Sequence, residues 1–223
     1  MIRFFDILFS SLGLFFLFPL FVIIITLLKF SGEGEIFYFQ KRVGVDRKIF
    51  GLFKFATMLK NSEKIGTKTL TIKNDPRILP MGSFLRKTKI NELPQLINVL
   101  KGDMSLIGPR PLTPDTFEKY SCKVKNTISK HRPGLSGVGS IIFRNEEEIV
   151  TNTNDASSFY FDVIAPYKGE LEIWYCKKIN IFFYFHLILL TLLVVLLPNK
   201  NFHKIFLRDL PEPDESLKRI LNL

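Results

Sequence analysis

The sequence predicts a mixed α/β, helix-rich membrane protein, and three observations support this fold class. A long uncharged segment of 22 residues, Ile7 to Leu28, lies near the N-terminus. A polar region follows it, in which short alternating and helical apolar patterns are mixed. A second apolar run, Ile181 to Leu197, has 17 residues and one histidine. We therefore expect a membrane segment at residues 1–30, one folded domain at 31–200 and a polar tail at 201–223.

The first apolar segment is long enough to cross a bilayer, whereas the second is of borderline length. Pro19 lies near the middle of the first segment, where it predicts a bend or a break in the helix. Arg3 precedes this segment and Lys29 follows it, so both ends favour the cytoplasmic side. Asp6 at its start argues against a cleaved signal peptide. Two alternatives remain open, a re-entrant hairpin and an ordinary kinked transmembrane helix.

The charge of the chain is unevenly distributed. Residues 29–132 contain 21 Lys and Arg against 9 Asp and Glu, although the whole chain carries only +10. A basic region beside an apolar segment indicates the cytoplasmic face of a membrane with anionic lipid. Nucleic-acid binding is not expected, because most aromatic residues lie inside apolar runs and no recognised motif is present. Cys122 and Cys176 lack metal-ligand spacing and fit reduced thiols.

The folded domain begins with weak strand signals. The segment GEIFYFQKRVGVDRKIFGLFKFATM predicts short extended stretches interrupted by Gly44 and Gly51. Residues 74–87, NDPRILPMGSFLRK, predict a turn followed by a short helix.

A clearer helical pattern follows at residues 92–100. Its apolar residues recur at i, i+3, i+4 and i+7 and are Leu93, Leu96, Ile97 and Leu100. Pro94 fits only the first turn, and Gly102 suits the residue after the helix. We therefore expect Asn91 as the N-cap and Glu92 in the first turn.

The same stretch carries candidate phosphate chemistry. A helix N-terminus binds phosphate through free N–H groups, and the carboxylate of Glu92 could hold a cation or act at phosphorus. Arg110 lies between Pro109 and Pro111, and a rigidly held guanidinium suits bidentate phosphate binding. Taken alone, Arg110 fits a surface salt bridge and Asp103 fits a turn residue. Glu92, Asp103 and Arg110 lie within about twenty residues of one another, in a basic region next to a membrane segment. Together these three residues favour a phosphate site.

The segment LRKTKINELPQLINVLKGDMSLIGPRPL resembles the signature of the bacterial sugar transferases, which are small monotopic polyprenyl-phosphate phosphoglycosyl transferases. The likeness extends over most of the chain, through FDILFSSLGLFFLFPL, FYFQKRVG, KFATM, HRPGLSGVG and FRNEE. It implies transfer of a sugar 1-phosphate from a UDP-sugar to polyprenyl (undecaprenyl) phosphate, with UMP as the second product. Such a step starts the assembly of a surface glycan, namely a capsule, O-antigen, exopolysaccharide or glycoprotein glycan.

The resemblance also implies a location and a cofactor. It implies a re-entrant helix broken at Pro19 and a catalytic domain on the cytoplasmic face of the bacterial inner membrane. Residues 181–197 would then be an interfacial or membrane segment. Mg²⁺ is the implied cofactor, with Glu92 as its ligand. Association as a homodimer or with downstream glycosyltransferases is left open.

Site roles follow from the same resemblance. The implied catalytic residues are Glu92 and Asn91, the implied phosphate-binding residues are Arg110, Arg86 and Arg144, and the site-organising residues are Asp103, Pro109 and Pro111.

Asn91 departs from the family's usual Asp-Glu pair, in which the Asp is taken as the nucleophile. A neutral amide is a poor nucleophile at phosphorus. Three hypotheses follow: direct displacement by the lipid phosphate, attack by a reoriented Glu92, or a catalytically impaired membrane scaffold. One of the acids Glu146, Glu147 and Glu148 could compensate for Asn91, although a solvated acidic helix start is the simpler reading.

Overall fold

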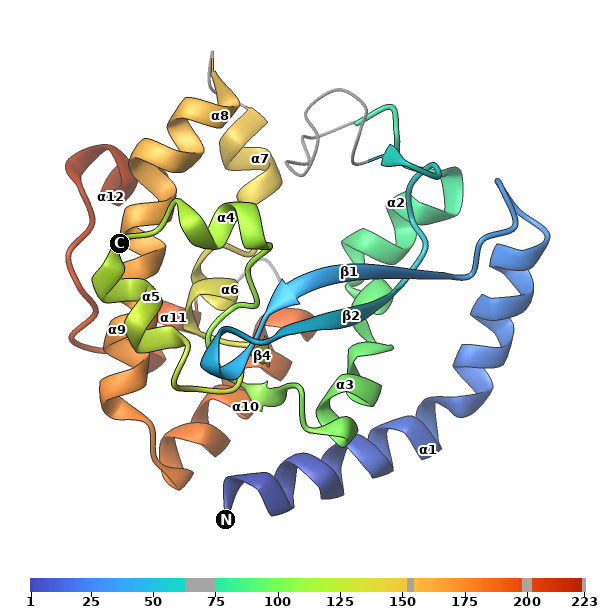
Figure 1. Cartoon of the computed structure of the whole chain (residues 1–223), viewed down its shortest axis with the longest axis horizontal. Coiled ribbons are helices and arrows are strands. Elements are labelled where there is room, and N and C mark those ends of the chain that lie inside the picture. Colours follow the sequence, from blue (N-terminus) through green and yellow to red (C-terminus); the bar gives the residue numbers. More distant parts are fainter. Residues whose placement is uncertain (63–74, 152–154, 198–201, 222–223) are drawn as a thin grey trace.

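The computed structural model describes residues 1–62, 75–151, 155–197 and 202–221. Its helices surround two small sheets (Figure 1). The strands are β1 (Phe37–Val43), β2 (Ile49–Phe55), β3 (Ser105–Ile107) and β4 (Gly134–Ser136). The helices are α1 (Ile2–Lys29), α2 (Pro80–Lys87), α3 (Gln95–Lys101), α4 (Pro114–Glu118), α5 (Cys122–Ile128), α6 (Val138–Ile142), α7 (Glu146–Thr151), α8 (Ala156–Phe159), α9 (Ala165–Lys178), α10 (Ile181–Leu196), α11 (Phe202–Phe206) and α12 (Glu215–Leu221). The mixed α/β, helix-rich class is confirmed.

The two sheets differ in direction. β1 and β2 form an antiparallel hairpin in which Phe37 pairs with Phe55 and Val43 with Ile49. Gly44 lies at its turn, and the extended segments expected on either side of this glycine are confirmed. The expected interruption at Gly51 is wrong, because Gly51 lies inside β2 and pairs with Lys41. β3 and β4 pair in parallel, which the sequence did not predict. In Figure 1 the hairpin crosses the middle of the molecule, between α2 and α3 on one side and α4 to α6 on the other.

α1 is a helix of 28 residues with Pro19 inside it. Within the described residues it is the one helix long and apolar enough to cross a membrane. Figure 1 shows α1 running along one edge of the domain and then turning sharply in its second half. A proline inside a helix removes a backbone hydrogen bond and produces such a bend. Large apolar side chains of α1 remain exposed and include Phe15, Phe16, Phe18 and Ile23.

The expected helix at residues 92–100 is present but begins later. A single 3₁₀ turn spans Ile90–Glu92, and α3 starts at Gln95 after Pro94. The prediction that Asn91 caps the helix is therefore wrong: the Asn91 side chain is buried, and Pro94 holds the N-cap position. Gly102 ends the helix with φ of 95°, as predicted, because this left-handed conformation favours glycine.

The main core lies around α9 and α10. One face of α10 is buried through Tyr184, Leu187, Leu190 and Val194, and the opposite face is exposed through Phe182, Leu189, Leu192 and Leu196. α10 has 16 residues and packs on the domain with one apolar face uncovered. Leu207, Leu217 and Leu221 of the expected tail also lie in this core. The tail therefore packs against the domain.

Candidate functional site

Glu92 lies on the 3₁₀ turn and faces a lysine from the hairpin. Its Oε1 is 3.2 Å from Nζ of Lys54, and the two side chains are 21% and 17% exposed. Burial by itself would raise the pKa of Glu92, but the charges of Lys54, Arg110 and Lys89 lower that pKa to about 2. The carboxylate therefore stays ionised at neutral pH, and its side chain remains partly exposed.

Lys54 is a site residue that the sequence did not predict. Burial, assisted by the charges of Arg42 and Arg110, lowers its pKa to about 8, although Glu92 opposes this shift. The pKa of Arg42 falls to about 10 for the same reasons, burial first and Arg110 next. A lysine between Phe53 and Phe55 in a half-buried strand was the available signal.

Arg110 is held in place through its backbone, its side chain and the carbonyl of the next residue. Its backbone N–H donates to Oε1 of Glu172 over 3.2 Å, and its Nη1 donates to Oγ of Ser140 over 3.2 Å. The carbonyl of Pro111 accepts from Nη1 of Arg42 at 2.8 Å. Burial would lower the pKa of Arg110, but Glu92 and Glu146 outweigh it and raise that pKa. This guanidinium is therefore both fixed in position and permanently charged.

Glu172 is a second carboxylate beside Arg110 with a different environment. Burial raises its pKa to about 7, and Oε2 has no hydrogen-bond partner within the described part of the chain. A Cβ placed on Gly139 would lie 2.8 Å from Oε1, so this glycine leaves room for the carboxylate. Glu172 is far from Arg110 along the chain, and nothing local in the sequence links the two residues.

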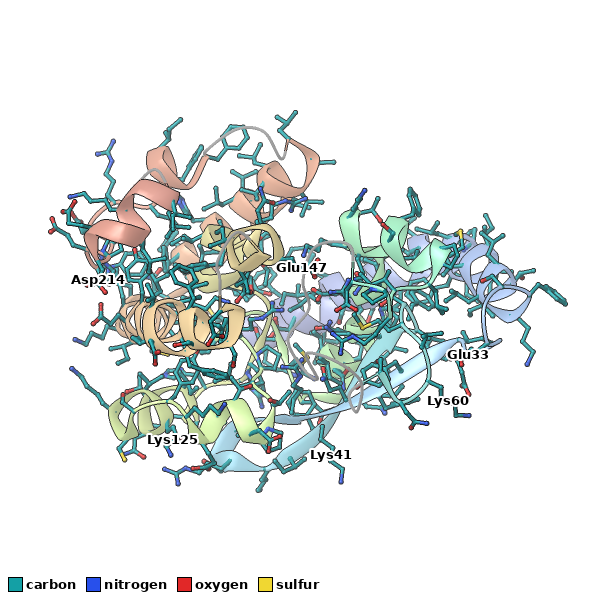
Figure 2. The ribbon with its side chains drawn as sticks, turned by 90° about the horizontal axis from the view of Figure 1, so that it is seen from above. Glu33, Lys41, Lys60, Lys125, Glu147 and Asp214 are labelled. Carbon is teal, nitrogen blue, oxygen red and sulfur yellow. The ribbon has the colours of Figure 1, made fainter. Side chains whose placement is uncertain are left out.

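Two acids at the start of α7 form ion pairs. Glu146 forms an ion pair with Lys168 at 2.6 Å, and Glu147 forms one with Arg86. Figure 2 shows Glu147 near the middle of the molecule, between the α9 side and the α2 side. The expectation of a solvated acidic helix start is therefore wrong for Glu146, whose side chain is 22% exposed, whereas Glu147 is both paired and 45% exposed.

Of the other predicted site residues, Arg144 lies near Lys89, whereas Asp103 contacts the end of α3. Arg144 is close enough to Lys89 to contribute to its lowered pKa, after burial and the charges of other neighbours. Asp103 instead accepts from Nδ2 of Asn98 over 3.2 Å, beyond the C-terminal end of α3. The structure thus gathers Glu92, Arg110 and Arg144 near Lys89, and it places Asp103 in a turn.

The oxygen donors of the site fit a hard cation in part. The described residues contain no group of three or more His, Cys, Asp or Glu that could hold a metal by themselves. Oδ1 of Asn91 is buried without a hydrogen-bond partner in the described chain, directly before Glu92. Mg²⁺ commonly takes one or two protein oxygens and completes its shell with water and substrate phosphates. Asn91 and Glu92 match that donor set.

The arrangement is an accessible acid surrounded by cations. Four cations surround Glu92, and the charge of each shifts the pKa of Glu92 or of another member of the group; they are Arg42, Lys54, Lys89 and Arg110. In a site with little water, such cations stabilise a diphosphate and the charge that develops when it breaks. The geometry therefore fits the class of enzymes that transfer phosphoryl-linked groups.

Comparison with known proteins identifies the class directly. A sequence model of the bacterial sugar transferases matches residues 1–198, and the chain belongs to this family. The exopolysaccharide production protein ExoY of Sinorhizobium fredii is 37% identical over 163 residues, which are 67% of this chain and 72% of that protein.

Two further relatives are longer proteins. The galactosyl transferase CpsE of Streptococcus agalactiae is 38% identical over 205 residues, 87% of this chain and 42% of CpsE. The undecaprenyl-phosphate galactose phosphotransferase of Salmonella typhimurium is 37% identical over 155 residues, 63% of this chain and 31% of that protein. The chain therefore corresponds to one part of each of these two relatives.

Proposed function

We propose that this chain is a phosphoglycosyl transferase that moves a sugar 1-phosphate from a UDP-sugar to polyprenyl (undecaprenyl) phosphate and releases UMP. Membership of the family and the names of the relatives support this reaction class. The observation that carries the proposal is the ionised, partly exposed Glu92 among Lys54, Lys89 and Arg110. Such a group is suited to a diphosphate and to its metal ion.

The proposed mechanism is direct displacement. An oxygen of the lipid phosphate attacks the phosphorus that carries the sugar, a new P–O–P bond forms, and the bond to UMP breaks. UMP leaves with the electron pair of the broken bond. Asn91 carries no charge and cannot supply the covalent nucleophile. Glu92 is bound to Lys54 at 3.2 Å, and this ion pair favours a positioning role over attack by Glu92.

The other residues support the phosphates. Arg110, Arg86 and Arg144 bind them, while Pro109 and Pro111 restrict the backbone that carries Arg110. Asn91 and Glu92 would hold Mg²⁺, which when bound neutralises charge on the diphosphate. Asp103 acts indirectly, because its contact with Asn98 fixes the end of α3.

The membrane placement is part of the same proposal. The bend in α1 and the basic residues at its two ends support a re-entrant helix with both ends on the cytoplasmic face. The uncovered apolar face of α10 would lie in the membrane interface. The domain would then be monotopic and would meet its lipid substrate at the inner surface of the bacterial cytoplasmic membrane.

The test is UMP release by the purified protein with polyprenyl phosphate, Mg²⁺ and a panel of UDP-sugars. Omission of the lipid is the control, and Asn91→Asp is measured in parallel. We expect release by the wild type only when the lipid is present. If only Asn91→Asp releases UMP, the native chain is an impaired scaffold and the proposal fails.

A further inference from the structure

A cavity of about 480 Å³ lies away from Glu92, at the start of α1. It is bounded by the first turn of α1, the hairpin turn, the segment after α3, the segment before β4 and Ile179. Its volume is in the range of sites that hold small ligands. The cationic residues that line it are Arg3, Lys48, Lys130 and Arg132, the acidic ones are Asp6 and Asp103, and His131 lies between the last two cations.

The acids of this cavity already have partners. Oδ1 of Asp6 accepts from Oγ of Ser105, the backbone N–H of Leu106 and the hydroxyl of Tyr184, at 2.8–2.9 Å. Oδ2 of Asp103 accepts from Asn98. The two carboxylates are therefore committed to neutral donors of the protein.

The basic residues are not paired with acids. Arg3 donates to the carbonyls of Val99 and Leu100, and Arg132 donates to the carbonyl of Gly102 at 3.0 Å. Within the described residues neither Lys48 nor Lys130 makes an ion pair, and both are exposed. With four cationic side chains against two carboxylates, the lining of the cavity carries a net positive charge.

The cavity is separate from the Glu92 group. One face of β2 carries Phe50, Leu52 and Lys54. Lys54 contacts Glu92 at one end of this row, and Phe50 lines the cavity at the other end. Four residues of a strand span roughly 13 Å. Leu52 packs with Val99 and Met104 in a buried cluster between the two places. A phosphate in the cavity would therefore not be the reacting phosphate.

The cavity also borders apolar surface. Phe4, next to Arg3, is 64% exposed, and Phe182, shortly after Ile179, is 84% exposed. The ring centroids of Phe5 and Phe185 are 4.9 Å apart, so the start of α1 and the start of α10 are adjacent. A cationic pocket beside exposed aromatic residues suits a ligand with a phosphate at one end and hydrocarbon at the other.

We propose that this cavity binds the phosphate of an anionic phospholipid headgroup, with Lys48 and Lys130 as its principal contacts. The bound lipid would hold the α1–α10 corner at the membrane surface. This inference rests on the membrane placement proposed above and not on the transfer reaction. A soluble phosphate shares the same chemistry, and the experiment separates the two sources.

The test uses the full chain in phosphatidylcholine nanodiscs titrated with phosphatidylglycerol, with bound lipid counted by native mass spectrometry. The variant is Lys48→Gln/Lys130→Gln. The matched control is Lys41→Gln/Lys123→Gln, which changes charge equally at exposed sites outside the cavity. Figure 2 shows Lys41 on the outer side of the hairpin.

We expect the cavity variant to bind phosphatidylglycerol roughly 30-fold more weakly, because each basic residue at an anionic lipid surface contributes about 1 kcal/mol. The control should bind as the wild type does. Equal binding by the cavity variant and the wild type would overturn the site. Tight binding of inorganic phosphate to the lipid-free protein, with displacement of phosphatidylglycerol, would overturn the lipid assignment. A wild type that releases no UMP but shows the expected lipid result would contradict only the transfer reaction.

Discussion

Glu92 and Asp6 are carboxylates in two regions of the molecule, and their neighbours differ in kind. Glu92 is reached by cations, and its side chain is 21% exposed. Asp6 is 1% exposed and accepts from three neutral donors of β3 and α10. The first retains charge for a ligand, whereas the second fastens α1 to the domain. The two carboxylates therefore differ both in the charge of their partners and in their exposure to a ligand.

The largest expected effect is on activity at the Glu92 group. Glu92→Gln removes the negative charge while its side chain can still bond to Lys54. We expect UMP release to fall on the order of 10²–10³-fold, the scale observed when one electrostatic group of a transfer site is lost. The thermal unfolding temperature should also fall, because Lys54, Lys89 and Arg110 lose the carboxylate that compensates their charges, so the rates are compared at a temperature where both proteins are folded. The assay is steady-state UMP release, and a rate within threefold of the wild type would contradict the assigned role.

At Asp6 the expected effect is a loss of stability. Asp6→Ala leaves Ser105, Leu106 and Tyr184 without their acceptor, so the free energy of unfolding should fall by about 2–4 kcal/mol. Asp6→Asn retains an oxygen acceptor and serves as the milder control. Thermal unfolding in a fixed detergent measures both variants. An Asp6→Ala protein as stable as the wild type would show that the three contacts do not fasten α1.

The sequence predicted one of these regions far better than the other. Glu92 and Arg110 lie in one short segment whose motif and proline restraints are local. Lys54 and Glu172 come from distant elements, and only packing brings them to that segment. The role of Asp6 depends on Ser105 and on Tyr184, which are about 100 and 180 positions away.

The local fold was predictable for similar reasons. The alternation around Gly44 predicted extended segments but not their pairing, and the spacing of apolar residues predicted α3. The first turn of α3 was misplaced because Lys89 adopts a left-handed conformation with φ of 61°, which directs the chain into a 3₁₀ turn. Lysine carries no local signal for that conformation.

A smaller, pH-dependent effect distinguishes Glu172 from Glu92. The folded pKa of Glu172 is raised from 4.5 to about 7, so the folded protein binds more protons than the unfolded chain between these values. Stability from this group is full below pH 4.5 and is lost as pH rises to 7, on the order of 3 kcal/mol. Glu172→Gln should remove this slope. Urea unfolding from pH 5 to pH 8 tests it, and an unchanged slope would refute the assignment.

The smallest expected effect concerns the space beside Glu172. A Cβ in Gly139→Ala would lie 2.8 Å from Oε1 and displace the carboxylate from the N–H of Arg110. UMP release should fall about tenfold, which corresponds to about 1.4 kcal/mol of transition-state stabilisation. Gly51→Ala is the matched control, because a Cβ there meets no atom within 4 Å. Equal rates for the two variants would show that Glu172 does not position Arg110.

Direct displacement without a covalent intermediate is the central claim, and a stoichiometric reaction without lipid tests it most directly. Protein at high concentration is mixed with the UDP-sugar that supports turnover, and UMP and intact protein mass are measured together. We predict no UMP and no added mass for the wild type with Asn91. Release of one UMP per protein, with a matching gain of a sugar phosphate on the chain, would contradict direct displacement.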